Sequence, residues 1–260
     1  MLPQLVRIGD FFLPTYGLLV TAGFLIALWL ATRLAAKSGL NKEAVFNLGI
    51  YCGLAGILGA KLLLILVDFR YYVRNPGEIF SFSTFQAGGI FYGGLLAALA
   101  TAYLYMRHKR LPVLATADAF APGLALGHAV GRVGCFAAGC CWGLECHRPW
   151  AVTFRNPVAN QLFGTPLNVP LHPTQIYEAA AEALTFGILY ARFHRPHKAG
   201  GVIGLYLSLY AVARFVIEFF RAPESPNPFG GPFTTAQWIS IGLFVLGAVV
   251  LTRRPKAAGR

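Results

Sequence analysis

The sequence predicts an all-α polytopic membrane protein, a bundle of about seven transmembrane helices with its N-terminus outside and its C-terminus in the cytoplasm. Three observations predict this class. Only 12% of the 260 residues are charged and 56% are hydrophobic, whereas about 25% are charged in an ordinary soluble domain. Apolar runs recur along almost the whole chain. Basic residues cluster between the runs, on what becomes one side of a seven-span arrangement.

Four apolar runs are long enough to cross a bilayer as helices, which takes about 20 residues. They cover residues 11–32, 44–67, 88–106 and 234–252, and the only charge within them is Lys61. The first run lacks a basic segment before it and is longer than the apolar part of a signal peptide, so we expect it to remain as a helix.

Three further spans contain ionisable residues. They cover residues 111–131 with Asp118 and His128, 173–191 with Glu178 and Glu182, and 200–220 with Arg214 and Glu218. Charges at membrane depth are costly and usually face a bundle interior or a wet cavity. Function is therefore to be sought in these three spans.

The net charge of +12 is explained by orientation. Basic clusters occur near residues 33–42, 107–110, 192–198 and 253–260, and the positive-inside rule makes that side cytoplasmic. Contact with anionic membrane lipids accounts for the charge, and no nucleic-acid partner is needed. Residues 1–260 then form a single integral membrane domain, with extracytoplasmic loops at about 68–87, 135–172 and 222–234.

One helical face in YAVARFVIEFFR, residues 210–221, carries a carboxylate and two guanidinium groups. Tyr210, Arg214 and Glu218 are spaced four residues apart, and Arg221 returns near the same face. One explanation for these charged groups is structural, namely that they form ion pairs between helices. Arginine also binds phosphate bidentately and keeps its charge when partly desolvated, and we favour this reading as an anion site.

Arg132 lies between Gly131 and Gly134, where the fourth span meets the outer loop. It either extends to the lipid head groups or joins Arg214 and Arg221 around an anion, for which a lipid phosphate is the obvious candidate. The segment HPTQIYEA, residues 172–179, opens the next span with polar groups. His172 there is a candidate base or orienting residue.

Two tyrosines at the outer ends of spans are weaker candidates. Tyr92 lies in AGGIFYGG, residues 87–94, where small residues favour close helix packing. Tyr16 fits an interfacial anchor.

Four of the five cysteines lie in GRVGCFAAGCCWGLEC, residues 131–146. The spacing C-x4-C-C-x4-C matches no common zinc or iron–sulfur pattern, so no metal is predicted. Adjacent Cys140 and Cys141 do not pair easily, which leaves Cys135 and Cys146 as the plausible disulfide partners. A membrane thiol–disulfide protein that uses these four thiols is therefore one alternative function.

A transporter or channel is another alternative, with Asp118, Glu178 and Glu182 as its intramembrane charges. No internal repeat stands out, which weakens a transporter built from duplicated halves. The motifs GxSxG, HExxH, Walker A and GxGxxG are absent from the sequence. This disfavours the standard hydrolase, zinc-protease and nucleotide-binding classes.

Six segments, in order, resemble the prolipoprotein diacylglyceryl transferase family of bacterial membrane enzymes. They are TYGLL (15–19), GGIFYGG (88–94), ADAFAPGLALGHAVGRVGCF (117–136), PWAVTF (149–154), HPTQIYEA (172–179) and YAVARFVIEFFRAPE (210–224). The resemblance implies transfer of the diacylglyceryl group of phosphatidylglycerol to the lipobox cysteine of a prolipoprotein signal peptide. The products are a thioether and glycerol 1-phosphate. The resemblance also implies that the protein lies in the bacterial cytoplasmic (inner) membrane, that its active site faces the extracytoplasmic side, and that it uses no cofactor.

The resemblance assigns expected roles to residues of this chain. The expected catalytic residues are Arg132, Arg214, Tyr210, His172 and Tyr92. The expected substrate-binding residues are Arg132, Arg214, Arg221, Glu218, Tyr16, Gly143 and Glu178. His172 and Tyr92 are the candidates for assisting removal of the acceptor thiol's proton.

The chain departs from the family signature GR-x-GN-F-x-N-G-E-x-W-G within the cysteine-rich stretch. Cys135 and Ala138 stand where the two asparagines are expected, and Cys140 stands where the glutamate is expected. Tyr92 replaces a frequent histidine. A related phospholipid-dependent transferase with a different acceptor is therefore a further alternative.

Overall fold

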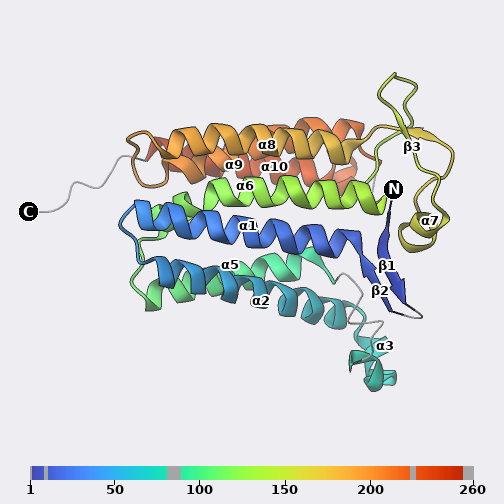
Figure 1. Ribbon diagram of the computed structural model, residues 1–260, viewed down its shortest axis with the longest axis horizontal. Coiled ribbons are helices and arrows are strands. Elements are labelled where there is room, and N and C mark those ends of the chain that lie inside the picture. The colour runs from blue at the N-terminus through green and yellow to red at the C-terminus, as the bar shows by residue number, and fades with distance from the viewer. Residues whose placement is uncertain (1, 9–10, 81–88, 223–226, 254–260) are drawn as a thin grey trace, which may run out of the picture. The chain divides into compact units, whose positions relative to one another are not determined.

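The computed structural model describes residues 2–8, 11–80, 89–222 and 227–253, and helices dominate it (Figure 1). Several predictions fall partly outside the described residues. These are the ends of two expected outer loops, residues 81–87 and 223–226, the first glycine of the third apolar run, and the basic tail from residue 254.

The long helices are α1 (Thr15–Lys37), α2 (Lys42–Val67), α5 (Phe91–His108), α6 (Val113–Ala138), α8 (Thr174–Phe193), α9 (Gly201–Ile217) and α10 (Thr235–Thr252). The short helices are α3 (Phe69–Arg74) and α7 (Pro157–Phe163), with 3-10 turns η1 (Pro76–Phe80), η2 (Glu218–Phe220) and η3 (Pro228–Gly230). The strands are β1 (Gln4–Ile8), β2 (Phe11–Pro14), β3 (Val152–Thr153) and β4 (Pro170–Leu171).

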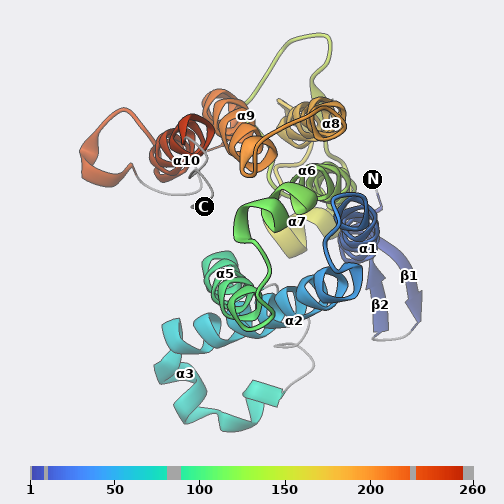
Figure 2. The ribbon, with the colours of Figure 1, turned by 90° about the vertical axis from the view of Figure 1, so that its left-hand side faces the viewer.

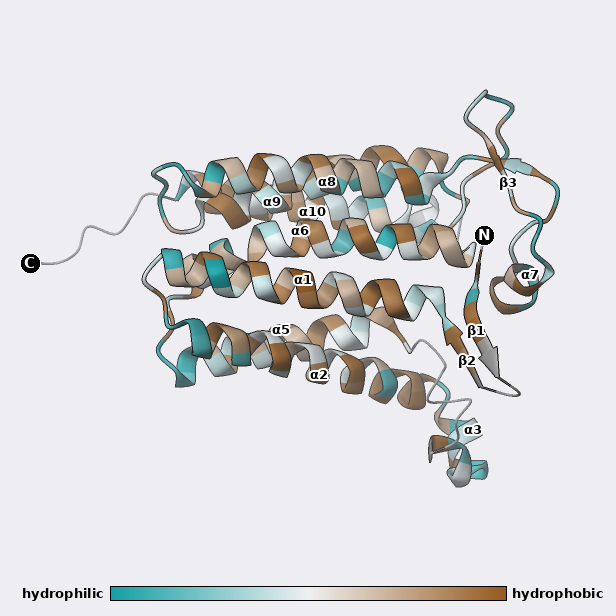
Figure 3. Cartoon of the chain, in the orientation of Figure 1, coloured by the Kyte–Doolittle hydropathy of each residue, from teal (hydrophilic) through white to brown (hydrophobic). Residues whose placement is uncertain are grey.

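Five of the described helices are long and apolar enough to cross a membrane: α1, α2, α6, α9 continued by η2, and α10. The helix α5 ends in Arg107 and His108, and α8 carries Glu178 and Glu182, which lowers the apolar character of both. Hydrophobic residues make up much of each long helix, and hydrophilic residues lie mainly near the helix ends (Figure 3). The multi-pass helical membrane class is confirmed in this form.

The start of the first predicted helix is wrong by a few residues. The apolar run begins at Phe11, but residues Phe11–Pro14 form β2 and pair antiparallel with β1. Proline disfavours the α conformation in the residue before it. The helix α1 therefore begins only at Thr15, after Pro14.

The described chain divides into two compact units, Met1–Leu34 with Ala117–Arg260, and Ala35–Thr116. In the second unit, α2 and α5 pack through glycines. A Cβ atom on Gly94 would lie 2.7 Å from the carbonyl oxygen of Gly56, and one on Gly93 would lie closer still to the carbonyl oxygen of Gly59. The glycines around Tyr92 are therefore accounted for by close helix packing, the structural explanation favoured by the sequence.

In the first unit, α9 packs against both α8 and α10 (Figure 2). Small residues again allow the close approach. A Cβ atom on Gly247 of α10 would lie 2.8 Å from the carbonyl oxygen of Gly204 in α9, and Gly23 of α1 meets Gly127 of α6 in the same way. Thr234 and Gln237 form a capping box that starts α10.

Asp118 has a structural role at the start of α9. Its carboxylate accepts hydrogen bonds from the backbone N–H groups of Gly200 (2.7 Å), Val202 (2.9 Å) and Ile203 (2.7 Å). The first N–H groups of a helix have no partner within the helix and carry partial positive charge. This buried carboxylate, one of the predicted intramembrane charges, therefore caps a neighbouring helix.

Candidate active site

A buried carboxylate on α8 lies among three arginines that come from separate segments of the first unit. Oε2 of Glu178 lies 2.5 Å from Nε of Arg132 on α6. Oε1 lies 3.4 Å from Nη1 of Arg214 on α9 and 3.3 Å from Nη1 of Arg221, which follows η2. The glutamate is 4% exposed. The arginines predicted to converge do so, and Glu178 is the carboxylate between them.

A second carboxylate fixes Arg214 from the other side. Nη1 of Arg214 lies 2.6 Å from Oε2 of Glu218, one turn later along the helix. The hydroxyl of Thr234, just before α10, donates to Oε1 of Glu218 at 2.9 Å. Glu218 therefore positions the guanidinium group and links it to the start of the last helix.

His128 joins a third carboxylate to the arginine network. Nε of Arg132 donates to Nε2 of His128 at 3.2 Å, one turn earlier on α6. Nδ1 of His128 lies 3.6 Å from Oε1 of Glu182 on α8. Three guanidinium groups face the three carboxylates of Glu178, Glu182 and Glu218. The network is balanced, as buried charges require.

A small pocket opens onto this network. Its lining residues are Glu178, Ala181, Glu182, Tyr210, Ala213, Arg214 and Ile217. The ring of Tyr210 lies 5.7 Å, centroid to centroid, from the ring of His128. Tyr210, Arg214 and Glu218 thus share one face, as their spacing predicted, and this face borders the pocket.

Gly143 brings the cysteine-rich loop against the end of η2, the turn that follows α9. It forms an isolated antiparallel bridge with Arg221, and its N–H donates to the carbonyl oxygen of His172 at 3.0 Å. A Cβ atom here would lie 2.6 Å from the Cβ of His172 and closer still to the carbonyl oxygen of Phe220. Glycine is needed because three chain segments meet without space for a side chain.

The imidazole of His172 lies among aromatic side chains. Its Nδ1 is 3.0 Å from the hydroxyl of Tyr177, and its ring centroid is 5.2 Å from that of Phe220. The backbone of His172 supports the loop, since its N–H donates to the carbonyl oxygen of Leu144 at 2.9 Å. The structure thus places His172 beside Gly143 and the end of α9, while its role as a base stays a prediction.

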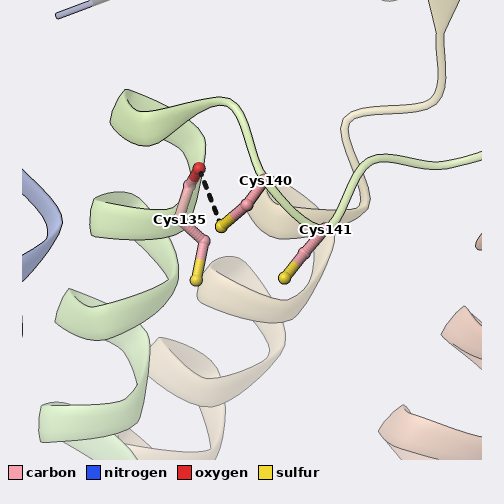
Figure 4. A group of neighbouring side chains, drawn as sticks. All are labelled: Cys135, Cys140 and Cys141. Atoms are coloured by element: carbon pink, nitrogen blue, oxygen red, sulfur yellow. Dashed lines mark hydrogen bonds between the residues drawn. The ribbon is translucent and has the colours of Figure 1, made fainter. Parts of the chain in front are cut away.

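Three of the cysteines meet at the end of α6. The sulfur atoms of Cys135, Cys140 and Cys141 all lie within 4.8 Å of one another (Figure 4). Cys146 is buried and is not part of this group. All five cysteines of the chain belong to the described residues, and each is a free thiol. The predicted pairing of Cys135 with Cys146 therefore does not occur in this structure.

The loop thiols of this group differ in their acidity. The pKa of Cys141 lies well below its ordinary value because the thiols of Cys135 and Cys140 hydrogen-bond to its sulfur, and the charges of Arg221 and Arg132 add to the effect. The pKa of Cys140 is raised because its thiol is held in hydrogen bonds to Cys135 and Cys141. The hydrogen bonds within the group thus shift the pKa values of Cys140 and Cys141 in opposite directions.

The two candidate tyrosines lie in different units. Tyr16, in the first turn of α1, packs beside Gly134 and interacts electrostatically with Arg132 and the cysteine group. It is 42% exposed. Tyr92 lies on α5 in the second unit, is 50% exposed and makes an edge contact with Phe91.

Sequence analysis gave no binding or catalytic role to two residues that the structure adds to the site. The first is His128. Its spacing of four residues from Arg132 places both on one helical face, and this spacing is the sequence signal for it. The second is Gln175, which is fully buried at the start of α8 and donates through Nε2 to the carbonyl oxygen of Cys140 at 2.6 Å. No sequence pattern indicates this contact, because it joins the start of α8 to a turn 35 residues earlier in the chain.

The chain was also compared with known proteins. The sequence profile of the family described as prolipoprotein diacylglyceryl transferase matches residues 3–253. The phosphatidylglycerol–prolipoprotein diacylglyceryl transferase of Clostridium tetani is 34% identical over 251 residues, covering 96% of each chain. The proteins of the same name from Vibrio parahaemolyticus and Photobacterium profundum are also 34% identical. They match 96% and 98% of this chain and 89% and 94% of their own lengths.

The family profile matches nearly the whole chain, and the relatives named above share more than 30% identity with it over most of their lengths. The chain belongs to the prolipoprotein diacylglyceryl transferase family.

Proposed function

We propose that this protein transfers the diacylglyceryl group of phosphatidylglycerol to the cysteine thiol of a prolipoprotein lipobox. The acceptor sulfur attacks the diacylglyceryl CH₂ that carries the phosphate. A carbon–sulfur bond forms, the carbon–oxygen bond breaks, and its electron pair leaves with glycerol 1-phosphate. The thiol proton passes to a base or to water. The family to which the chain belongs and the names of its relatives support this reaction.

The observation that carries the proposal is the meeting of Arg132, Arg214 and Arg221 around one buried carboxylate. The phosphodiester of the lipid carries one negative charge, and the phosphate monoester that leaves carries up to two. Guanidinium groups held beside the phosphate therefore bind the transition state more strongly than the lipid itself. A partly buried site increases this difference, because water screens the charges less.

Glu178 and Glu218 hold the guanidinium groups in place before the lipid arrives. Glu178 contacts all three arginines. Glu218 pairs with Arg214. A network that is neutral without substrate also limits the cost of burying three positive charges. When the phosphate enters, it takes over part of the role of the carboxylate.

The remaining candidate residues have supporting roles in this proposal. Tyr210 borders the pocket and donates its hydroxyl to the lipid head group. Gly143 lets the loop approach Arg221. His172 assists removal of the thiol proton, and Tyr16 contacts the lipid or the acceptor peptide at the outer end of α1.

The topology belongs to the same proposal. Seven helices, namely α1, α2, α5, α6, α8, α9 and α10, cross the bacterial cytoplasmic membrane, with the N-terminus outside and the C-terminus inside. The short basic segment between α8 and α9 then faces the cytoplasm, and the arginine network faces outward. The signal peptide of an exported precursor reaches this face with its lipobox in the outer leaflet.

The direct test incubates purified protein with phosphatidylglycerol and a lipobox peptide, and detects the thioether product by mass spectrometry. Arg132→Ala is expected to lower transfer by about 10²- to 10³-fold, the effect of removing one donor to a developing negative charge. The matched control is Arg155→Ala, which removes an exposed arginine of the same unit and is expected to leave transfer unchanged.

An unmodified peptide, with the protein shown to be folded, would refute the lipoprotein acceptor. The cysteines that replace expected asparagine and glutamate residues make a different acceptor the second candidate. Release of glycerol 1-phosphate in a membrane extract, without lipidation of the peptide, would favour that candidate.

A further inference from the structure

The three cysteines at the end of α6 form a group that the proposed reaction does not yet use. Cys135 lies on the last turns of α6 and is buried, while Cys140 and Cys141 lie on the turn that follows. Figure 4 shows their side chains converging on a common space. All three sulfur atoms are within 4.8 Å of one another. A zinc ion with Zn–S distances of ~2.3 Å holds its sulfur ligands about 3.8 Å apart. Small side-chain rotations would bring these atoms to that separation.

The turn that carries two of the thiols is fixed to the start of α8. The hydroxyl of Thr174 donates to the carbonyl oxygen of Cys141 at 2.9 Å, and the amide of Gln175 donates to that of Cys140 at 2.6 Å. Both donors are fully buried. Such contacts from surrounding residues fix the orientation of side chains that bind a metal.

Two further observations indicate that the turn is built for a ligand. Cys141 has a φ angle of +62°, a left-handed conformation that non-glycine residues rarely adopt and that concentrates at functional sites. Within the described part of the chain, Oε1 of the buried Gln175 side chain has no hydrogen-bond partner. A buried amide oxygen without a partner, on the side chain that holds this turn, is suited to accept a hydrogen bond from a ligand bound there.

We propose that Cys135, Cys140 and Cys141 bind one zinc ion, and that the fourth position of this ion takes the thiol of the acceptor peptide. Thiolates select soft or borderline ions such as zinc. Three protein ligands with one open position are the arrangement of catalytic zinc sites, whereas structural sites use all four. The acceptor class that this site recognises is a peptide thiol.

The group lies next to the arginine network, which is what the reaction requires. Gly143, two residues after Cys141, bridges to Arg221, and the N–H of Leu144 donates to the carbonyl oxygen of Phe220 at 2.8 Å. Arg221 and Arg132 both interact electrostatically with Cys141. Their positive charges also offset the net negative charge of a zinc ion held by three thiolates.

This inference rests on the proposed function and gives it a means of activating the acceptor. The peptide thiol binds zinc as a thiolate and releases its proton to water, because a bound metal deprotonates a coordinating thiol. Its sulfur then attacks the diacylglyceryl carbon, and the carbon–oxygen bond breaks toward the phosphate held by the arginines. The product thioether is neutral and a weaker ligand, so it leaves the zinc. The oxidation state of the ion does not change.

The spacing along the chain did not indicate this site, because its ligands follow no linear zinc motif. The turn after α6 brings residues 140 and 141 back over the last helical turn. The replacement of expected asparagine and glutamate residues by Cys135 and Cys140 provides two of the three thiols. Zinc would thus supply the activation that those polar groups no longer provide.

The first test measures metal in the full-length protein, purified under reducing conditions from cells supplied with zinc. About one zinc ion per chain is expected for a site of this kind. Cys140→Ala and Cys141→Ala are each expected to lower the zinc content at least tenfold. Cys146→Ala removes a buried cysteine of the same loop outside the group and is expected to retain the zinc. Loss of zinc in Cys140→Ala alone still supports the site if Cys141→Ala does not fold.

The second test replaces zinc with Co²⁺, whose thiolate complexes absorb strongly. The wild-type protein should show thiolate-to-cobalt absorption, and a lipobox peptide added without lipid should change it. A peptide with serine in place of cysteine should not. This readout needs no transfer, so it separates failure of the zinc site from failure of the proposed reaction.

Several outcomes would overturn the inference. A wild-type protein that contains no zinc, or copper in its place, would refute the zinc site. An equal loss of zinc in Cys146→Ala and Cys141→Ala would show that the three cysteines are not the specific ligands. A cobalt absorption spectrum that does not change when the lipobox peptide is added would show that the peptide thiol does not bind the metal. A disulfide among the three cysteines that persists under reducing conditions would also overturn it. Chelation that removes the zinc but leaves peptide lipidation at full rate would refute the catalytic role.

Discussion

Nε of Arg132 lies 2.5 Å from Oε2 of Glu178, and this contact joins the C-terminal part of α6 to the start of α8. The same carboxylate contacts Arg214 and Arg221. One residue thus connects all the positively charged groups that the proposed reaction uses. This makes Glu178 a stability determinant as well as a positioning residue for the arginines.

Replacing Glu178 with glutamine is expected to destabilise the folded protein by about 3–5 kcal/mol, because it leaves buried arginines without their shared partner. The measurement is unfolding in detergent. Glu145→Gln is the matched control, because the side chain of Glu145 is largely exposed and its described ion pair is with the exposed His147. A substitution at such an exposed position shifts stability by less than about 0.5 kcal/mol. Equal effects of the two substitutions would contradict the central place of Glu178.

Tyr210→Phe removes a single hydroxyl at the edge of the pocket. We expect transfer to fall by about tenfold or more with little change in stability, because a hydrogen bond to a charged group contributes about 1.5–3 kcal/mol. Steady-state kinetics should show the loss in kcat. The control is Tyr190→Phe, a partly exposed tyrosine of α8 that stacks on His194. If the phenylalanine variant at 210 keeps full activity, the hydroxyl does not touch the lipid.

Asp118→Asn tests the role of the buried carboxylate at the start of α9. An amide has one oxygen instead of two, so at least one of the three backbone N–H groups loses its acceptor. The expected loss is about 1–2 kcal/mol of stability, as for other helix caps. Transfer by the folded fraction should be unchanged. Normal stability with lost activity would instead assign Asp118 to a charge pathway, as a transporter requires.

Gly143→Ala is expected to abolish the bridge to Arg221, because the added methyl group would overlap His172 and Phe220. Both stability and transfer should fall. Gly187→Ala is the matched comparison on α8, where nothing lies within 4 Å of the new atom. It should be neutral or stabilise the helix by up to about 1 kcal/mol. Similar behaviour of the two variants would show that the loop adapts to a side chain at position 143.

Much of the candidate site could be predicted from the spacing of residues along helices. Tyr210, Arg214 and Glu218 share a face because helical neighbours recur every three to four residues, and the structure retains this arrangement. The glycines around Tyr92 predict close helix packing for a different local reason, because small residues let two helices approach each other. Local periodicity determines which residues share a face, whatever that face later contacts.

The contacts between helices could not be predicted in this way. Glu178 was chosen as a candidate, but nothing in the sequence indicates that it meets three arginines from three segments. In the sequence Asp118 is one of several charges within the apolar spans. Only the packing of α9 against it shows that its carboxylate caps the start of that helix. The cysteine spacing matched no metal motif, yet the turn after α6 brings three thiols together.

The sequence by itself determined the class of the protein, its apolar helices, the polar faces of its functional helices and its family. These depend on composition and on local periodicity, which each segment carries independently. The tertiary structure decided which charges are partners and which cysteines are neighbours. Such pairings depend on how separate helices pack, and a linear pattern does not encode the distance between residues on different helices.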